Sequence, residues 1–206
     1  MININKITYL FIIYTSSINY LISDSNTYYN FKSIQKWESI QIGDVEIRKS
    51  LYQPYPFCQV KSVVPYGLNQ VTDVIQNVNL YPNVFKRISE VEKYSDDVAH
   101  IKINMPYPLS PRDYIIKYTS AKIRQEWIFK FNSVRNDSFS SSGKYVRLEN
   151  AMGEWRLTRI DKNKTLISYT WNGQLLGDFP KWALSKAWKK QGNEIIYWLT
   201  EYLSKK

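Results

Sequence analysis

Arg112 and Asp113 are the side chains whose setting first suggests a specific chemistry. They belong to the segment "MPYPLSPRDYIIKYTS", residues 105–120, in which three prolines fall within six residues. Proline fixes its own backbone φ and lacks an N–H donor, so this loop is stiff. A stiff loop followed at once by two opposite charges and an apolar strand fits three structures: a catalytic loop, a structural corner or the lip of a binding cavity.

The single cysteine and the single histidine restrict the remaining chemistry. Cys58 alone cannot form an intramolecular disulfide or a zinc site. A Ser-His-Asp or Cys-His arrangement would have to use His100. His100 alternates with Ile101 and Ile103, which predicts that its side chain faces away from the apolar side of a strand. We therefore expect no catalytic residues, no metal site and no cofactor.

The composition predicts one globular domain with room for a cavity. The chain has 206 residues, of which 44% are hydrophobic and 16% aromatic, including seven Trp and 17 Tyr. A chain of this length can enclose a core and still leave an internal hollow. Two explanations fit the aromatic excess: a general bias towards Ile, Asn, Lys and Tyr codons, or a wide apolar site lined by large side chains.

The net charge of +10 permits attraction to anionic membranes or to nucleic acid. The basic residues are scattered, and their longest runs are pairs such as Lys189–Lys190 and Lys205–Lys206. They form no basic stripe with interleaved aromatic residues and match no nucleic-acid-binding motif. A solvated basic surface is the favoured interpretation, and we expect no nucleic-acid partner.

Residues 1–23 have the order of an export signal: one positive charge, Lys6, an apolar run from Ile7 to Tyr14, and then small polar residues. The apolar run is too short to anchor the chain across a bilayer. Cleavage after Ser17 or Ser23 would release a periplasmic or secreted protein. The alternatives are a buried N-terminal strand or a loosely attached tail, in a cytoplasmic protein.

The chain after residue 28 has no linker and no internal repeat. Phe31, Ile34 and Trp37 fall at helical spacing and predict a short amphipathic helix over residues 28–41. A second helix is predicted over 69–78 with Asn69 as its cap, followed by a helical turn over 77–85 that Pro82 interrupts. About nine strands are predicted, at residues 43–51, 56–64, 86–94, 98–105, 112–120, 126–134, 144–150, 153–160 and 164–173.

A long helix ends the chain. It is predicted to run from about Pro180 to Leu203, with Asp178 as its cap and Gly192 as a weak point. The strands before it alternate apolar and polar residues, as antiparallel sheets with one wet face do. The element order predicts an α+β fold in which a curved antiparallel sheet wraps around this last helix.

Three motifs give the chain a resemblance to a known family, the START (steroidogenic acute regulatory protein-related lipid transfer) domains. They stand in the family's order over residues 28–204: the Pro-Arg-Asp-aromatic stretch, the Val-Arg strand, and the Gly-x-x-Pro-x-Trp start of the last helix. The matching residues are Pro111, Arg112, Asp113, Tyr114, Val146, Arg147, Gly177, Pro180 and Trp182.

The sequence also departs from the family pattern. It has "LYPNVF" where the family often has Trp-Asp, and it places Ile101 and Tyr118 near the positions where some sterol-binding members hold a buried acid and base. The resemblance therefore carries no implication of sterol specificity.

The resemblance implies a helix-grip fold of the Bet v 1-like superfamily, with a hydrophobic tunnel between the sheet and the last helix. The candidates for its lining are Met105, Trp127, Phe129, Phe131, Trp155, Leu157, Trp171, Leu184, Trp188, Ile195 and Leu199. A charged lipid headgroup would be met by Arg112 or Arg147, since guanidinium suits phosphate. Arg112 and Asp113 would point to opposite sides of their strand, one fixing the loop through backbone hydrogen bonds and the other meeting a neighbouring strand.

The expected function is binding of a lipid or another apolar small molecule by a monomer, for transfer or sensing and without catalysis. The last helix and the loop after Met105 would open to exchange the ligand, and the basic surface would make transient contact with an anionic membrane. The alternative is an enzyme of the same superfamily, of the polyketide cyclase or aromatase type. A nucleic-acid or membrane-surface module is a third interpretation, supported by charge alone.

Overall fold

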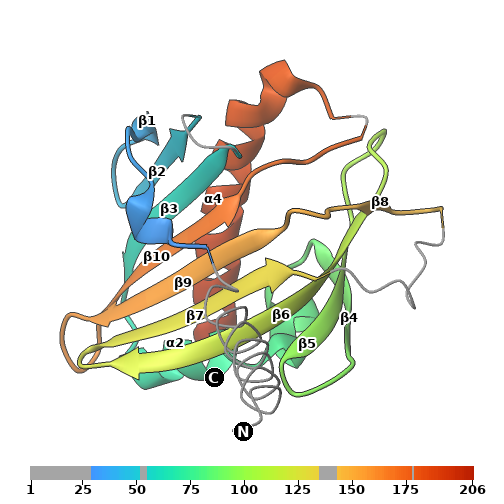
Figure 1. The fold of residues 1–206 in the computed structure, drawn as a ribbon. Helices are drawn as coiled ribbons and strands as arrows, with labels where there is room; N and C mark the ends of the chain where they lie inside the picture. The colour runs from blue at the N-terminus through green and yellow to red at the C-terminus, as the bar shows by residue number, and fades with distance from the viewer. Residues whose placement is uncertain (1–28, 52–54, 135–142, 178) are drawn as a thin grey trace, which may run out of the picture.

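A ten-stranded sheet curls around one long helix (Figure 1). The computed structural model describes residues 29–51, 55–134, 143–177 and 179–206. The predicted export signal, residues 1–23, and the predicted cap Asp178 lie outside the described residues. The domain limits therefore stay predictions.

The strands are β1 (Glu38–Gln41), β2 (Val45–Ser50), β3 (Phe57–Val64), β4 (Ile88–Lys93), β5 (Val98–Ile103), β6 (Arg112–Ile123), β7 (Glu126–Ser133), β8 (Val146–Arg147), β9 (Met152–Arg159) and β10 (Thr165–Asn172). The helices are α2 (Leu68–Ile75), α3 (Tyr81–Val84) and α4 (Leu184–Leu203), with the 3₁₀ turns η1 (Phe31–Ser33), η2 (Val78–Leu80) and η3 (Lys181–Ala183).

The sheet runs in the order β1-β2-β3-β10-β9-β7-β6-β5-β4, and neighbouring strands along this path are antiparallel. Strand β8 lies off the path and pairs with the start of β6 in parallel. Pairing of β10 with β3 joins the late strands to the early ones and makes the sheet continuous. The predicted α+β helix-grip fold is confirmed.

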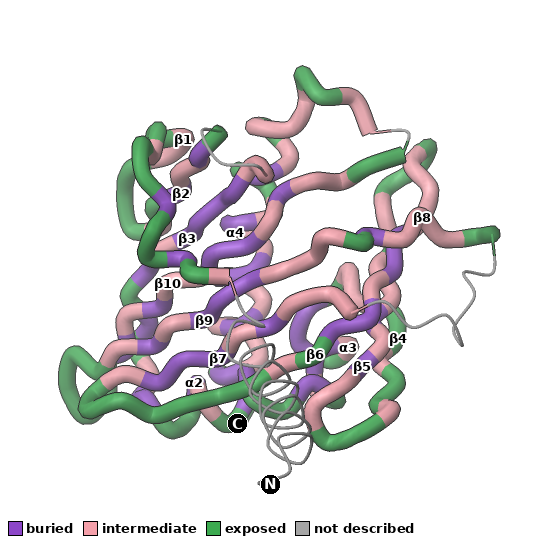
Figure 2. The backbone as a smooth tube through the Cα atoms, in the orientation of Figure 1, coloured by how far each residue is buried: buried purple, intermediate pink, exposed green. Residues whose placement is uncertain are grey.

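The two faces of the sheet follow the period of two in the sequence. In β7, Trp127, Phe129 and Phe131 face the helices and form the main core, whereas Lys130 and Asn132 face outwards. Buried positions accordingly alternate with more exposed ones along the strands (Figure 2). We call the side that faces α4 the inner face and the opposite side the outer face.

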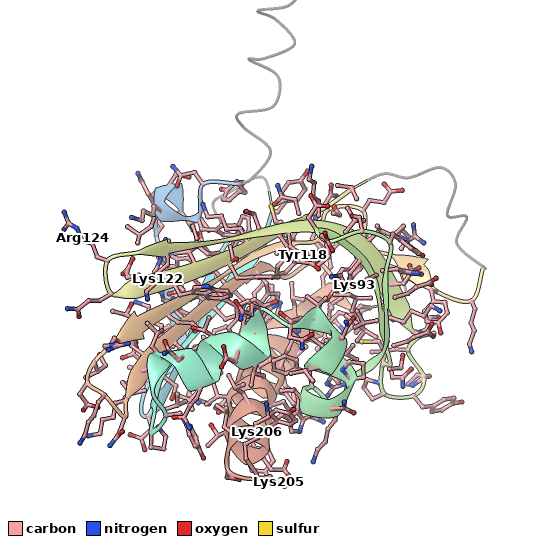
Figure 3. All side chains as sticks on the ribbon, turned by 90° about the horizontal axis from the view of Figure 1, so that it is seen from below. Lys93, Tyr118, Lys122, Arg124, Lys205 and Lys206 are labelled. Atoms are coloured by element: carbon pink, nitrogen blue, oxygen red, sulfur yellow. The ribbon has the colours of Figure 1, made fainter. Side chains whose placement is uncertain are left out.

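Seen from below, the sheet arches over α2, α3 and α4 (Figure 3). Gly192 brings α4 against the early strands, because a Cβ at this position would lie 2.8 Å from Ile47 Cδ1 and 3.5 Å from Val60 Cβ. The predicted weak point of the helix is thus a place where its backbone lies close to the sheet. Trp188 anchors the first half of α4 by donating from its indole Nε1 to the Gly173 carbonyl at 3.2 Å.

Several predicted elements were wrong in detail. The predicted helix over 28–41 is only the turn η1 among the described residues, followed by β1, which raises the predicted nine strands to ten. Lys36 has a φ of 56°, which ends any helical run, and Phe31 and Ile34 pack on the outer face against Phe57.

The caps and the proline were also misassigned. Helix α2 begins after Gly67, not Asn69, and the Gly67 N–H donates to Gln70 Oε1 at 3.0 Å. Pro82 does not interrupt a turn; it lies in the first turn of α3, where its missing N–H would have no helical partner.

Candidate functional site

An apolar pocket lies between the inner face of the sheet and α4. It has about 650 Å³ of space between protein atoms, part of which opens to solvent. We call it the inner pocket, and its lining comes from α3, β4, β5, β6, β7, β9, β10 and α4. The lining residues are Tyr81, Phe85, Arg87, Ile88, Ile101, Ile103, Tyr114, Ile116, Phe129, Phe131, Trp155, Tyr169, Gln191, Ile195 and Trp198.

Stacked aromatic rings form the wall of the inner pocket on the sheet side. Trp155 stacks on Tyr169 with ring centroids 4.0 Å apart, and Phe85 stacks on Trp155 from the side of α3 at 6.0 Å. Tyr114 stacks on Phe131 at 6.4 Å. Gly153 makes room for this packing, because a Cβ there would lie 2.5 Å from the Phe131 ring. Wide, flat side chains of this kind suit contact with a hydrocarbon ligand.

Three tyrosines line the inner pocket, and their hydroxyls differ in their hydrogen-bond partners. Tyr81 Oη donates to the Ile75 carbonyl at 2.7 Å. Tyr114 Oη and Tyr169 Oη have no hydrogen-bond partner among the described residues. Burial raises the pKa of each of these two hydroxyls above its usual value, so both stay neutral at physiological pH. Both side chains nevertheless retain accessible surface, because they line the pocket.

An ion pair lies at the edge of the inner pocket. Arg87 precedes β4, and its Nε donates to Glu194 Oε2 at 2.7 Å while its Nη2 donates to Oε1 at 2.9 Å. The pair is partly buried and joins α4 to the beginning of β4. Gln191, one helical turn before Glu194, lines the same edge.

Two further pockets share lining residues in succession with the inner one. A second pocket of about 600 Å³ shares Arg87, Ile103 and Gln191 with the inner pocket, and its wall includes Met105, Pro106, Leu109, Leu148, Leu175 and Phe179. A third, more open pocket shares Leu175 and Phe179 with the second. The three pockets therefore adjoin in sequence, from the interior to the loops that precede α4.

Arg112 fixes the loop that leads to α4. Its side chain is fully buried, and the guanidinium donates to the carbonyls of Leu175 at 3.1 Å and Leu176 at 3.0 Å and to that of Ser110. Leu176 has a φ of 49°, a conformation that a non-glycine residue holds only with support. The bond to the Ser110 carbonyl holds the proline-rich loop, so the predicted role of fixing that loop through backbone hydrogen bonds is confirmed for Arg112.

Asp113 points to the outer face and joins three strands. Arg147 on β8 binds both carboxylate oxygens at 2.8 Å, and His100 Nε2 lies 2.8 Å from Oδ2. Burial alone would raise the pKa of Asp113, but the hydrogen bonds and charges of Arg147 and His100 outweigh it and hold this pKa below its usual value. Tyr94 Oη lies 3.2 Å from His100 Nδ1 and completes the network.

The opposite orientations predicted for Arg112 and Asp113 are therefore confirmed, as is that of His100 away from the apolar side. Both proposed headgroup ligands, Arg112 and Arg147, are engaged within the protein. Headgroup contact by either one stays a prediction. In the described parts of the chain, no three His, Cys, Asp or Glu side chains gather closely enough to hold a metal ion.

The structure divides the predicted lining residues into three sets. Phe129, Phe131, Trp155 and Ile195 line the inner pocket. Met105 lines the second pocket, and Leu184 and Trp188 line the third. The remaining four line none of these pockets and pack into the main core: Trp127, Leu157, Trp171 and Leu199. Whether any of them contacts a ligand stays a prediction.

Sequence reasoning missed the polar groups of the inner pocket. Arg87 stands in "FKRISE", which has the composition of a basic surface, and Gln191 is one of several polar residues in the last helix. Tyr114 was noted as part of a motif, although its alternation with Asp113 places it on the inner face. That alternation could have identified Tyr114 and Tyr169, whereas no local signal identifies Arg87.

Solved structures share this fold. A fragment of a STAR-related lipid transfer protein from Xanthomonas axonopodis superposes with a TM-score of 0.71 at 17% identity, covering 82% of this chain and 99% of that one. Human STARD10 gives 0.73 at 14% identity, over 82% of this chain and 73% of that one. Human StAR-related lipid transfer protein 5 gives 0.72 at 13% identity, over 92% and 93%.

These likenesses establish the START, or helix-grip, fold for this chain. No protein-family model and no curated protein sequence matches the chain.

Proposed function

We propose that this protein binds one lipid or comparable apolar molecule in the inner pocket and transfers or senses it without converting it. The observation that carries this proposal is the lining of the pocket, which is aromatic or aliphatic except at one edge. Removing hydrocarbon from water contributes about 25 cal/mol per Å², so a buried chain of a few hundred Å² gains several kcal/mol before ordering costs.

The polar groups around the inner pocket support a binding role. An enzyme of the cyclase type needs a proton-transfer group beside its substrate. His100 lies on the outer face, bound to Asp113. Tyr114 and Tyr169 do face the pocket, but their raised pKa values make them poor bases at neutral pH. They can donate hydrogen bonds to a ligand, which positions it and does not convert it.

Exposed aromatic and basic residues favour exchange of the ligand at an anionic membrane. Trp182, just before α4, is 86% exposed, and Tyr107, in the loop before β6, is 97% exposed. Lys181 also lines the third pocket, and Lys186 is exposed on the first turn of α4. Trp and Tyr favour the membrane interface, and each nearby Lys contributes about 1 kcal/mol on an anionic surface. Among the described residues, no helix is both long and apolar enough to cross a bilayer.

We also propose export, with residues 1–23 as the signal. The support is the order of charge, apolar run and small residues in that segment. Intact mass of the protein recovered from its native host would decide this. A mass lacking the first 17 or 23 residues is expected, and a mass that retains them would contradict it.

Native mass spectrometry of the full chain, followed by solvent extraction, tests ligand binding. A stoichiometric apolar adduct is expected. Ile88→Trp fills the edge of the inner pocket and should abolish the adduct, whereas Val63→Trp adds the same bulk on the exposed outer face and should retain it. A ligand-free mass that persists after incubation with mixed liposomes would contradict lipid carriage and would move the cyclase or aromatase alternative to first place.

A further inference from the structure

Arg87 has an unusual position for a charged side chain. Among the described residues, it is the one cation that lines the inner pocket, and it lines the second pocket as well. It therefore lies where the two apolar pockets adjoin, together with Ile103 and Gln191. A charge placed against apolar walls is costly unless it is compensated, so its presence calls for a partner.

Glu194 is that partner in the structure, but its carboxylate binds only two of the three guanidinium nitrogens. The carboxylate binds Nε and Nη2, and no described residue accepts a hydrogen bond from Nη1. The Arg87 side chain remains 25% exposed and that of Glu194 20%. Donors on a fixed, partly accessible guanidinium can bind one more oxyanion, and guanidinium matches the geometry of carboxylate and phosphate oxygens.

Arg112 and Arg147, the two arginines predicted to contact a charged headgroup, are less suited to a ligand in the inner pocket. Arg112 is fully buried and holds three backbone carbonyls. Arg147 lies on the outer face, with two of its donors on Asp113, and it lines none of the three pockets described. Arg87 alone of the three combines accessibility with a place on the wall of the inner pocket.

We propose that the ligand is an amphiphile with a single oxyanion, a carboxylate or a phosphate, which binds Arg87 while its hydrocarbon chain fills the inner pocket. This rests on the proposed function and names the ligand class of the same site. The aromatic wall contacts the ligand's hydrocarbon chain, and Arg87 selects the charge of the ligand. Without ligand, Glu194 pairs with Arg87 and, at 3.9 Å, with Lys190; in the complex the ligand's oxyanion binds Arg87 alongside Glu194.

A neutral amphiphile of the same length gains the same hydrocarbon contacts but not the charge-assisted hydrogen bond. Such bonds contribute about 1.5 to 3 kcal/mol, which corresponds to roughly tenfold or more in affinity. The preference for the anion should therefore disappear when Arg87 is neutralised. It should increase when Glu194 is neutralised, because the competing carboxylate is then absent.

The test compares two pairs of probes with matched chains, at neutral pH: palmitate against hexadecanol, and oleoyl lysophosphatidate against monoolein. Binding is measured by native mass spectrometry and by competition with a fluorescent fatty-acid analogue. The full-length wild type should prefer at least one anion about tenfold or more, and the probe pair that shows it identifies carboxylate or phosphate. Arg87→Gln should abolish the preference, and Glu194→Gln should raise it.

Lys86→Gln is the matched control. Lys86 adjoins Arg87 and also pairs with a glutamate of α4, Glu201, at 3.1 Å, but it lines none of the pockets described. It should keep the wild-type preference. The double variant Arg87→Gln/Glu194→Gln leaves no unpaired carboxylate and should bind the neutral probes as the wild type does, which separates loss of the site from loss of the fold.

Equal binding of anionic and neutral probes by the wild type would overturn this inference and leave lipid carriage intact. Persistence of the preference in Arg87→Gln would overturn it too. Binding of none of the four probes, by a folded protein with an unoccupied pocket, would overturn the inference together with the proposed function.

Discussion

The Asp113 network on the outer face and the wall of the inner pocket both contain buried polar groups, but these groups differ in their hydrogen-bond partners. On the outer face, Asp113 accepts hydrogen bonds from Arg147 and lies within 2.8 Å of His100 Nε2. On the inner face, Tyr114 and Tyr169 have hydroxyls without a partner among the described residues, and Arg87 has a donor nitrogen without one. The Asp113 carboxylate is thus satisfied within the protein, whereas Tyr114, Tyr169 and Arg87 each keep a donor that a ligand can use.

This difference separates polar groups that stabilise the fold from polar groups that remain available to a ligand. A buried polar group with all its partners in the protein stabilises the fold, and its loss leaves those partners unsatisfied. A polar group that faces a pocket and lacks a partner costs little to remove from the empty protein. Its contribution appears only when a ligand supplies the missing partner.

The largest expected difference in stability is between two arginine-to-glutamine variants. Arg112→Gln removes donors from carbonyls of the loop before α4, in a fully buried site, and should lower the free energy of unfolding by about 3 kcal/mol. Arg87→Gln breaks a partly exposed ion pair and should cost about 1 kcal/mol or less. Urea denaturation of the unliganded proteins measures both.

Similar losses for the two variants would break the comparison, because Arg87 would then be as structural as Arg112. Loss of stability without loss of anion preference in Arg87→Gln would have the same meaning.

Asp113→Asn should give an intermediate effect that depends on pH. The pKa of Asp113 in the folded protein lies below its ordinary value of 3.8, so its charge stabilises the fold above that value. This contribution is lost as the pH falls through the folded pKa. The variant should be less stable than the wild type by about 2 kcal/mol at neutral pH, and the difference should shrink in acid below pH 3.8.

Urea denaturation of both proteins from neutral to acid pH measures this difference. Asp97→Asn is the control, since its ion pair with Lys117 is exposed and should change the stability little. A wild-type advantage that persists unchanged below the ordinary carboxyl pKa would refute the role assigned to the Asp113 charge.

The fold was predictable from the sequence where one periodicity dominates. Alternation in β7, as in Trp127, Phe129 and Phe131, allows only a strand with one apolar face. The stretch with Phe31, Ile34 and Trp37 has helical spacing, but its three side chains contact the outer face, and β1 forms by pairing with β2. Pairing between strands is a tertiary contact, which local spacing does not reveal.

The candidate site was predictable by face but not by position along the strand. Phe129 and Trp127 share one face of β7, yet only Phe129 lines the inner pocket. Leu157 packs into the core at the end of β9 where α2 covers the sheet. The packing of the helices decides which parts of the inner face they cover and which parts stay open as a pocket. Alternation along a strand carries no information about this packing. Arg87 was missed for the same reason.

The smallest contrast is between two tyrosines of the same wall. Tyr81→Phe removes a hydroxyl that donates to the Ile75 carbonyl at 2.7 Å and should lower the free energy of unfolding by about 1 kcal/mol. Tyr114→Phe removes a hydroxyl without a described partner from a buried ring, and the empty protein should be unchanged or slightly more stable. Calorimetry of the two variants with the ligand extracted measures this.

If Tyr114→Phe lowers the free energy of unfolding as much as Tyr81→Phe, then the Tyr114 hydroxyl has a partner inside the protein. The donors available to a ligand in the inner pocket would then be those of Arg87 and Tyr169. If Tyr114→Phe loses less stability than Tyr81→Phe, as expected, then added ligand should stabilise the wild type more than Tyr114→Phe. The reason is that the Tyr114 hydroxyl gains a hydrogen-bond partner only in the complex.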